Sequence, residues 1–250
     1  MQLTYFGANS WLLEFEQLHI LIDPWLVGRL CFGGQRWFFE GTHTLPTTIP
    51  DRIDLVLLAQ GLPDHAHPPT LKKLDRQLPV VASPSAAKVV QGLGYSTVTV
   101  LSPGQTHRVA DAVEIRATAG APVPQTENGY LITGLQTGKK LYYEPHGFSD
   151  RTLPTYAPID VVIAPVVDLT LPLAGAFVKG NQTTIQLLQA LQARYVLPTT
   201  AGEGIEYAGI IDRLLSVKGS PEHFRQQLQA ANLQTELVEA KPQQAIALTL

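Results

Sequence analysis

A run of apolar residues from Ile53 to Leu58 predicts a short buried strand, because it follows two turn residues and contains almost no polar side chain. The run leads into a polar loop that carries Asp64, His65 and His67. A strand that delivers a carboxylate and two imidazoles to one edge of a sheet is a common way to place metal ligands or acid and base groups. We therefore expect the functional site at this loop.

The start of the chain shows three apolar segments separated by turn residues, which predicts an antiparallel meander. The segments are Leu3–Phe6, Ser10–Glu16 and Leu18–Asp23. The stretch from Trp25 to Pro50 is rich in glycine and aromatic residues, and we expect it to be irregular. Its rings either pack over the sheet as a small satellite core or form an exposed contact surface.

The rest of the chain alternates helical and strand patterns. Helices are expected at Pro69–Leu74, Ser83–Gln91, Asn181–Ala193 and Ser220–Ala231, with Ser83 and Ser220 as N-caps that precede a proline. Strands are expected at Val80–Ala82, Ser96–Leu101, Thr106–Val109, Ala112–Thr118, Gly129–Thr133, Lys140–Glu144, Asp160–Ala164, Tyr195–Leu197 and Ala245–Leu250. The five strands between Ser96 and Glu144 form a second predicted meander. Strands followed by helices in each half predict an α+β protein with two mixed sheets and helices outside.

Composition narrows the function classes. With 250 residues, of which 45% are hydrophobic, the chain can bury a substantial core, and we expect one domain over residues 1–250. A formal net charge of −3 argues against a nucleic-acid partner. Cys31 is the only cysteine, which excludes an internal disulfide and a thiolate metal cluster. No stretch has the pattern of a signal peptide or a transmembrane segment, so we expect a soluble, cytoplasmic protein.

The loop after the Ile53–Leu58 strand resembles the signature of the metallo-β-lactamase-fold hydrolases, in which a strand runs into Thr-His-x-His-x-Asp-His. In this chain the corresponding residues are Ala59, Gln60, Gly61, Leu62, Pro63, Asp64 and His65. The Asp-His end is kept, and both members of the His-x-His pair are replaced. The opening strands are similar to the family as well, at Gly7, Ser10, Asp23 and Pro24. The resemblance covers nearly the whole chain and implies a four-layer αββα sandwich, in a divergent branch of the family.

The resemblance also implies the loss of one metal site. Binuclear members bind the first metal through three histidines. Gln60 and Leu62 stand where two of these would be, and no histidine occurs in the stretch 117–122, where the third is expected. An amide oxygen is a weak zinc ligand and leucine offers none, so the binuclear chemistry of the family is not expected here.

For the second metal, the resemblance leaves a smaller set. Asp64 and His65 are retained, the family's bridging aspartate has become His146, and the family's last histidine is absent near residues 197–200. Asp64, His65 and His146 would then form a two-histidine, one-carboxylate set for a single Zn, Mn or Fe(II). In such a site Asp64 and His65 are also the expected catalytic residues.

A loop without any metal is the alternative, in which the Asp-His pair caps a helix and hydrogen-bonds the loop. His67 and Glu144 are spare ligand candidates, for which a plain loop role is the simpler interpretation. Asp23 is expected to orient the loop through hydrogen bonds. The remaining histidines have no expected role in the site; they are His19, His43, His107 and His223.

Two function classes follow from these residues. The first is a hydrolase, resembling the lactonase and phosphodiesterase-like members, in which one metal activates water against an ester, lactone or phosphoester. The second is a non-catalytic descendant with a degenerate metal site, a pseudoenzyme that serves as a binding or assembly module through Trp25–Phe39. The partner is a small-molecule substrate in the first class and a protein in the second. The metal content is at most one in the first class and none in the second.

Overall fold

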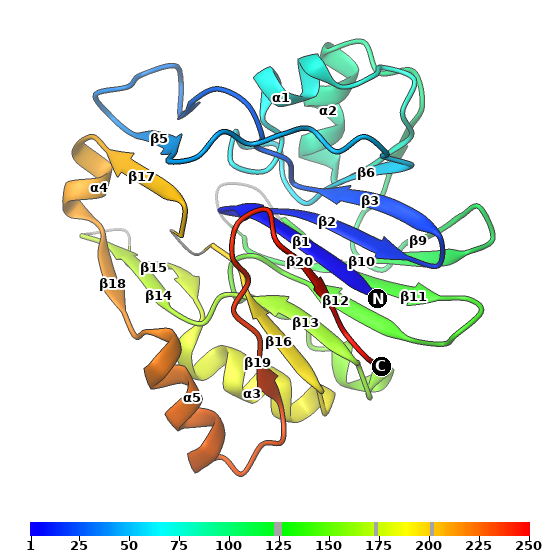
Figure 1. The fold of residues 1–250 in the computed structure, drawn as a ribbon, viewed down its shortest axis with the longest axis vertical. Coiled ribbons are helices and arrows are strands. Elements are labelled where there is room, and N and C mark those ends of the chain that lie inside the picture. Colours follow the sequence, from blue (N-terminus) through cyan, green and yellow to red (C-terminus); the bar gives the residue numbers. More distant parts are fainter. Residues whose placement is uncertain (123–126, 173–174, 201–202) are drawn as a thin grey trace. The chain divides into compact units, whose positions relative to one another are not determined.

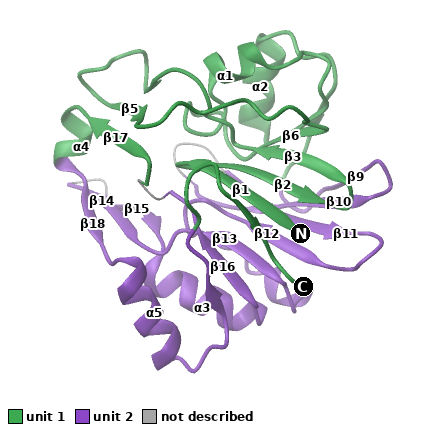
Figure 2. Ribbon diagram, viewed as in Figure 1, with its two compact units in different colours: residues 1–102, 201–213, 240–250 green, residues 103–200, 214–239 purple. Residues whose placement is uncertain are grey.

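The computed structural model describes residues 1–122, 127–172, 175–200 and 203–250. The chain forms two compact units, which Figure 2 shows in different colours. The first unit comprises Met1–Ser102, Ala201–Arg213 and Ala240–Leu250, and the second comprises Pro103–Thr200 and Leu214–Glu239. Neither unit is a contiguous piece of the sequence, because the chain passes from one to the other four times.

The first unit contains a seven-stranded sheet with the order β20-β1-β2-β3-β6-β7-β8 (Figure 1). Its strands are β1 (Gln2–Gly7), β2 (Ser10–Phe15), β3 (Leu18–Ile22), β6 (Leu55–Leu58), β7 (Val80–Ala82), β8 (Val98–Val100) and β20 (Ala245–Ala247). The predicted meander is confirmed, because β1, β2 and β3 pair antiparallel. Strands β6, β7 and β8 then add in parallel. All four side chains of β6 are buried, as its unbroken apolar run predicts.

Two helices of the first unit pack on this sheet. Helix α1 (Pro68–Lys73) and helix α2 (Pro84–Gly92) share an apolar cluster with the sheet, in which Leu71 and Val90 meet Val56 and other strand residues. The predicted cap of α2 is confirmed, because Ser83 Oγ accepts a hydrogen bond from the backbone N–H of Ala86 at 3.3 Å.

The aromatic stretch after Trp25 is more regular than its sequence predicts. Strands β4 (Leu30–Cys31) and β5 (Glu40–His43) form a three-stranded sheet with β17 (Ile205–Ala208). Trp25 is fully buried in a satellite core with Leu30 and Ile205. The prediction of irregular structure was wrong here because β5 pairs with a strand more than 160 positions later, and a local pattern carries no signal for that pairing.

The second unit contains the other seven-stranded sheet, with the order β19-β16-β13-β12-β11-β10-β9. Its strands are β9 (Thr106–Val109), β10 (Val113–Ala119), β11 (Asn128–Gly134), β12 (Lys140–Tyr143), β13 (Val161–Ala164), β16 (Tyr195–Pro198) and β19 (Glu236–Leu237). Strands β9 to β12 pair antiparallel, and β13, β16 and β19 continue in parallel. Helices α3 (Asn181–Leu191) and α5 (Pro221–Ala230) and the 3₁₀ helix η1 (Leu153–Tyr156) pack on this sheet. The predicted cap of α5 is confirmed by the bond from His223 N–H to Ser220 Oγ.

One expectation about the strands was wrong, and one sheet was missed. The strand predicted at Ser96–Leu101 does not belong to the second meander; it is β8, which joins β7 in parallel because α2 carries the chain back across the first sheet. A further three-stranded sheet was not predicted, and it consists of β14 (Asp168–Leu171), β15 (Gly175–Lys179) and β18 (Ser216–Lys218). Its side chains are mostly half-buried or exposed, so they show no apolar period.

Helix α4 (Ile210–Leu214) completes the described helices. Within the ranges that the structure describes, no helix is long and apolar enough to cross a membrane.

Candidate functional site

The loop after β6 is fixed to the sheet by Asp23, which follows β3. The backbone N–H of Asp23 donates to Leu57 O at 3.0 Å, and its Oδ1 accepts from the backbone N–H of Ala59 at 2.7 Å. The loop then turns sharply, because the N–H groups of His65 and Ala66 both donate to the carbonyl of Leu62. The expectation that Asp23 orients this loop is confirmed.

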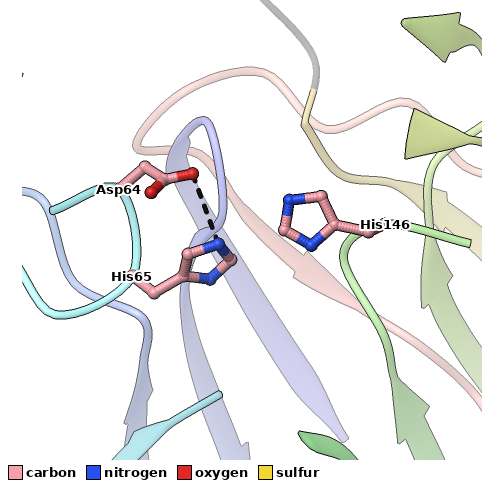
Figure 3. A group of neighbouring side chains, drawn as sticks. All are labelled: Asp64, His65 and His146. Carbon is pink, nitrogen blue, oxygen red and sulfur yellow. Dashed lines mark ion pairs between the residues drawn. The ribbon is translucent and has the colours of Figure 1, made fainter. Parts of the chain in front are cut away.

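His65 is fully buried and is held by a carboxylate at one ring nitrogen. Its Nδ1 lies 2.8 Å from Asp23 Oδ2, and its Nε2 lies 3.3 Å from Asp64 Oδ2 (Figure 3). Burial lowers the pKa of His65, but the charges of Asp64 and Asp23 outweigh that effect and raise it well above the usual value. The ring is therefore oriented by Asp23, which leaves Nε2 as the atom that faces Asp64.

Ser10 supports Asp23 from the side of β2. Its hydroxyl donates to Asp23 O at 2.9 Å and accepts from the backbone N–H of Trp25 at 2.8 Å. Asp23 has a φ of 41°, a left-handed conformation that is uncommon for a residue other than glycine. The surrounding bonds hold this residue in a conformation that costs free energy, as is frequent beside functional sites.

His67 has a structural role. It is the N-cap of α1, and its Nδ1 faces both the backbone N–H and the hydroxyl of Thr70, at 3.4 and 3.0 Å. Its Nε2 donates to Arg29 O at 3.1 Å. Burial lowers the pKa of His67 to about 4, so the ring is neutral at pH 7. Both nitrogens are engaged, which leaves His67 poorly suited to bind a metal.

In the second unit, His146 follows β12 and is paired with a buried carboxylate. Its Nδ1 lies 2.6 Å from Glu127 Oε2. Glu144 is fully buried beside it and accepts from the backbone N–H groups of His146 and Phe148, at 3.3 and 2.7 Å. Burial and the charge of Glu127 raise the pKa of Glu144 to about 7.

Glu127 was not predicted as a site residue. It stands just before β11, where a single charged residue next to an apolar strand gives no pattern to recognise. Its position depends on the hairpin between β10 and β11, in which Gly120 N–H donates to Glu127 O and Glu127 N–H donates to Ala121 O.

The structure places the predicted ligands in different units. Asp64 and His65 lie together in the first unit, and His146 belongs to the second. A site shared by all three therefore stays a prediction.

The residues that replace the first metal's ligands do not fit a metal. The buried side chain of Gln60 offers an amide, and Leu62 offers no donor atom. The end of β10, where the third histidine is expected, carries no imidazole. The binuclear arrangement is therefore not supported by these side chains.

Comparison with known proteins agrees with the resemblance seen in the sequence. The family model of the β-lactamase superfamily domain matches residues 2–200. A UPF0173 metal-dependent hydrolase of Cereibacter sphaeroides is 26% identical over 147 residues, which are 54% of this chain and 59% of that protein. The match thus spans less than two thirds of the length of such curated relatives.

Solved structures resemble the chain over its full length. An isothiocyanate hydrolase from Delia radicum gut bacteria has a TM-score of 0.75 at 15% identity, with all of both chains covered. A metallo hydrolase of the archaeon Ignicoccus hospitalis has a TM-score of 0.69 at 16% identity and covers 100% of this chain and 98% of its own. At such low sequence identity, the similarity to these structures shows the fold alone. They confirm the predicted α+β class and the metallo-β-lactamase fold.

Proposed function

The chain belongs to the β-lactamase superfamily, and from this membership we propose that it is a metal-dependent hydrolase with at most one metal ion, bound by Asp64, His65 and His146. The named relatives that are metal-dependent or metallo hydrolases support the reaction class. The proposed substrates are esters, lactones or phosphoesters.

One observation carries the proposal, which is the fully buried pair of His65 and Asp23. Histidines that bind metals commonly donate their other ring N–H to a carboxylate, which fixes the ring and makes the free nitrogen more basic. His65 has this arrangement, with Asp23 at Nδ1 and Nε2 turned toward Asp64. His146 has the same arrangement, with Glu127 at Nδ1.

The donor set suits one cation. Two imidazole nitrogens and a carboxylate can hold Zn, Mn or Fe(II) with positions open for water and substrate. A divalent cation in such a site supplies the Lewis acidity that makes water a nucleophile near neutral pH.

The protein's own groups have distinct roles in this proposal. Asp23 keeps the Nδ1 hydrogen of His65 in place, so Nε2 is the nitrogen that would bind a cation once its own proton has left to solvent. Asp64 is partly exposed, so its carboxylate can both bind and accept a proton from the attacking water. The buried loop around Ala59 and Ala66 holds both groups on a rigid support.

Metal content and hydrolysis test the proposal together. The wild type, His65→Ala and the control His19→Ala are expressed with added metals, and their metal content is measured by mass spectrometry. We expect at most one transition metal in the wild type and the control, and none in His65→Ala. A lactone, p-nitrophenyl acetate and bis-p-nitrophenyl phosphate serve as substrates, and at least one activity should disappear with chelator and in His65→Ala. Two tightly bound metals would overturn the proposal.

A second candidate function is the non-catalytic binding module. It is favoured by Trp37 and Phe38, which are 63% and 38% exposed, since large rings at the surface often mark a contact site. This candidate gains support if the wild type binds no metal, hydrolyses none of the substrates, and loses a partner when both rings are replaced.

A further inference from the structure

We propose that Glu127, Glu144 and His146 form a binding site for one divalent cation within the second unit. This inference does not rest on the proposed function, because neither Asp64 nor His65 takes part. The two sites share His146, so they compete for one ion. One possible ligand atom from each of the three residues lies within 4.8 Å of the others. Ligands that surround one cation at about 2.1 Å are themselves at most about 4.2 Å apart, so a small inward movement of the side chains completes the set.

Charge gives the reason for a cation at this point. Both carboxylates are fully buried, and His146 is the one imidazole in the group. The imidazole pairs with Glu127 Oε2. A buried charge is costly unless it is paired or bound to a metal. A divalent cation balances both carboxylates at once.

The backbone holds all three residues in place. Glu144 N–H donates to Ile163 O at 3.0 Å, and Lys179 N–H donates to His146 O at 2.8 Å. Glu127 is fixed by two backbone bonds in the hairpin between β10 and β11. The turn after His146 is equally constrained, because a Cβ on Gly147 would lie only 1.8 Å from Lys179 O. Ligands on such rigid supports need little reordering when they bind a cation.

Gly129 has no side chain to occupy the space beside Glu144. A Cβ at this position would lie 2.6 Å from Thr118 Oγ1, 2.7 Å from Tyr142 Oη and 3.3 Å from Glu144 Cγ. Two buried hydroxyl oxygens therefore face the same point beside Glu144. These oxygens make the surroundings of the carboxylate polar, which suits a hydrated cation more than an apolar core does.

The chemistry of the donors selects the class of cation. Two carboxylate oxygens and one imidazole nitrogen suit Mn²⁺, Fe²⁺ or Zn²⁺, and no thiolate is present to favour softer metals. Binding replaces the proton that His146 Nδ1 and Glu127 Oε2 share at 2.6 Å, so the cation enters and a proton leaves to solvent. The two atoms then separate by about 0.8 Å to reach the spacing of about 3.4 Å between tetrahedral ligands of one metal.

Cation binding to the purified full-length chain tests this site. The metal-free protein is titrated with Mn²⁺ and with Zn²⁺ by calorimetry, and the melting temperature is followed with and without each ion. The variants are Glu127→Gln and Glu144→Gln, which keep the shape of the side chain and remove its charge. Glu114→Gln is the matched control in the same unit, because Glu114 pairs with Arg108 at the surface of β10.

We expect each of the two site variants to weaken binding at least tenfold and to lose the rise in melting temperature that the ion gives the wild type. Glu114→Gln should bind as the wild type does. Retained binding in His65→Ala would assign the ion to Glu127, Glu144 and His146 and not to the site of the proposed function. Loss of binding in His65→Ala with normal binding in Glu144→Gln would overturn this inference and support the site of the proposed function. A wild type that binds neither ion would overturn both. Circular dichroism of each variant shows whether it is folded, and any unfolded variant is replaced by its Asp counterpart, which shortens the carboxylate and should also weaken binding.

Discussion

The imidazole of His65 and the carboxylate of Asp23 form a fully buried ion pair, with 2.8 Å between Nδ1 and Oδ2. The two residues are 42 positions apart, and their pairing ties the end of β3 to the loop after β6. Asp23 Oδ1 meanwhile holds the backbone of Ala59, so one carboxylate positions both the ring and the loop.

Replacing Asp23 with asparagine should destabilise the protein by about 3–5 kcal/mol, because it removes one member of a buried pair. The effect should depend on pH. The folded pKa of His65 lies above its ordinary value, so the stability from the pair is fully present below about pH 6.5 and is lost as the pH rises through the folded pKa. Urea unfolding in chelator at several pH values measures this. Glu114→Gln, at an exposed pair, should cost less than about 1 kcal/mol; an equal cost for both variants would contradict the prediction.

His67 should give the opposite dependence on pH. Its folded pKa of about 4 lies below the ordinary value of 6.5, so its contribution to stability is complete above pH 6.5 and declines as the pH falls toward 4. The difference between the two pKa values corresponds to at most about 3 kcal/mol. His67→Asn keeps a side chain that caps helices and does not titrate. The unfolding free energy of the wild type should therefore fall relative to that of His67→Asn when the pH is lowered from 7 to 5. A constant difference between the two proteins would contradict this prediction.

Gly147→Ala and Gly138→Ala should lower the free energy of unfolding by different amounts. Both glycines have a positive φ, 79° and 69°, so each alanine variant loses about 1–2 kcal/mol from backbone strain. The added methyl group at Gly147 would also collide with Lys179 O, whereas at Gly138 it meets nothing within 4 Å. Urea midpoints of the two variants measure the difference. We expect Gly147→Ala to be several kcal/mol less stable, and equal midpoints would show that the turn after His146 can adjust.

Mutations in the aromatic stretch should affect stability to different degrees at buried and at exposed rings. Replacing Trp37 and Phe38 with serine should cost less than the loss of a buried ring, because Trp37 is 63% exposed and Phe38 is 38% exposed. Trp25→Ser should cost about 3–5 kcal/mol, because that ring fills the satellite core. Thermal melts of both proteins provide the measurement. A large loss in the double variant would place the exposed rings in the core as well.

The sequence predicted those parts of the fold whose cause is local. The run Leu55–Leu58 is apolar at every position, and it is a buried strand. Ser83 and Ser220 each precede a proline, and each caps a helix. Strand β5 was missed because its partner β17 lies far along the chain. Strand β14 was missed because its side chains are all half-buried and show no alternation.

The residues of the candidate site also include some that the sequence predicted and one that it did not. The Asp-His pair at the end of an apolar strand is a local signal, and both residues lie in the loop where they were expected. Glu127 acts through its pairing with His146, which is 19 positions away and separated from it by a hairpin turn. A single glutamate gives no periodic signal of such a pairing, so only the folded chain reveals it.

The pairing of β1 with β20 has a consequence for synthesis of the protein. Residues 2–4 bond to residues 245–247, so the edge of β1 stays without its partner until almost the whole described chain has been made. At about 5–20 residues per second, that interval lasts roughly 12–50 s on the ribosome. An unpaired strand edge is a template for association with other chains during this time. Slowing translation of the codons between β1 and β20 should therefore lower the soluble yield.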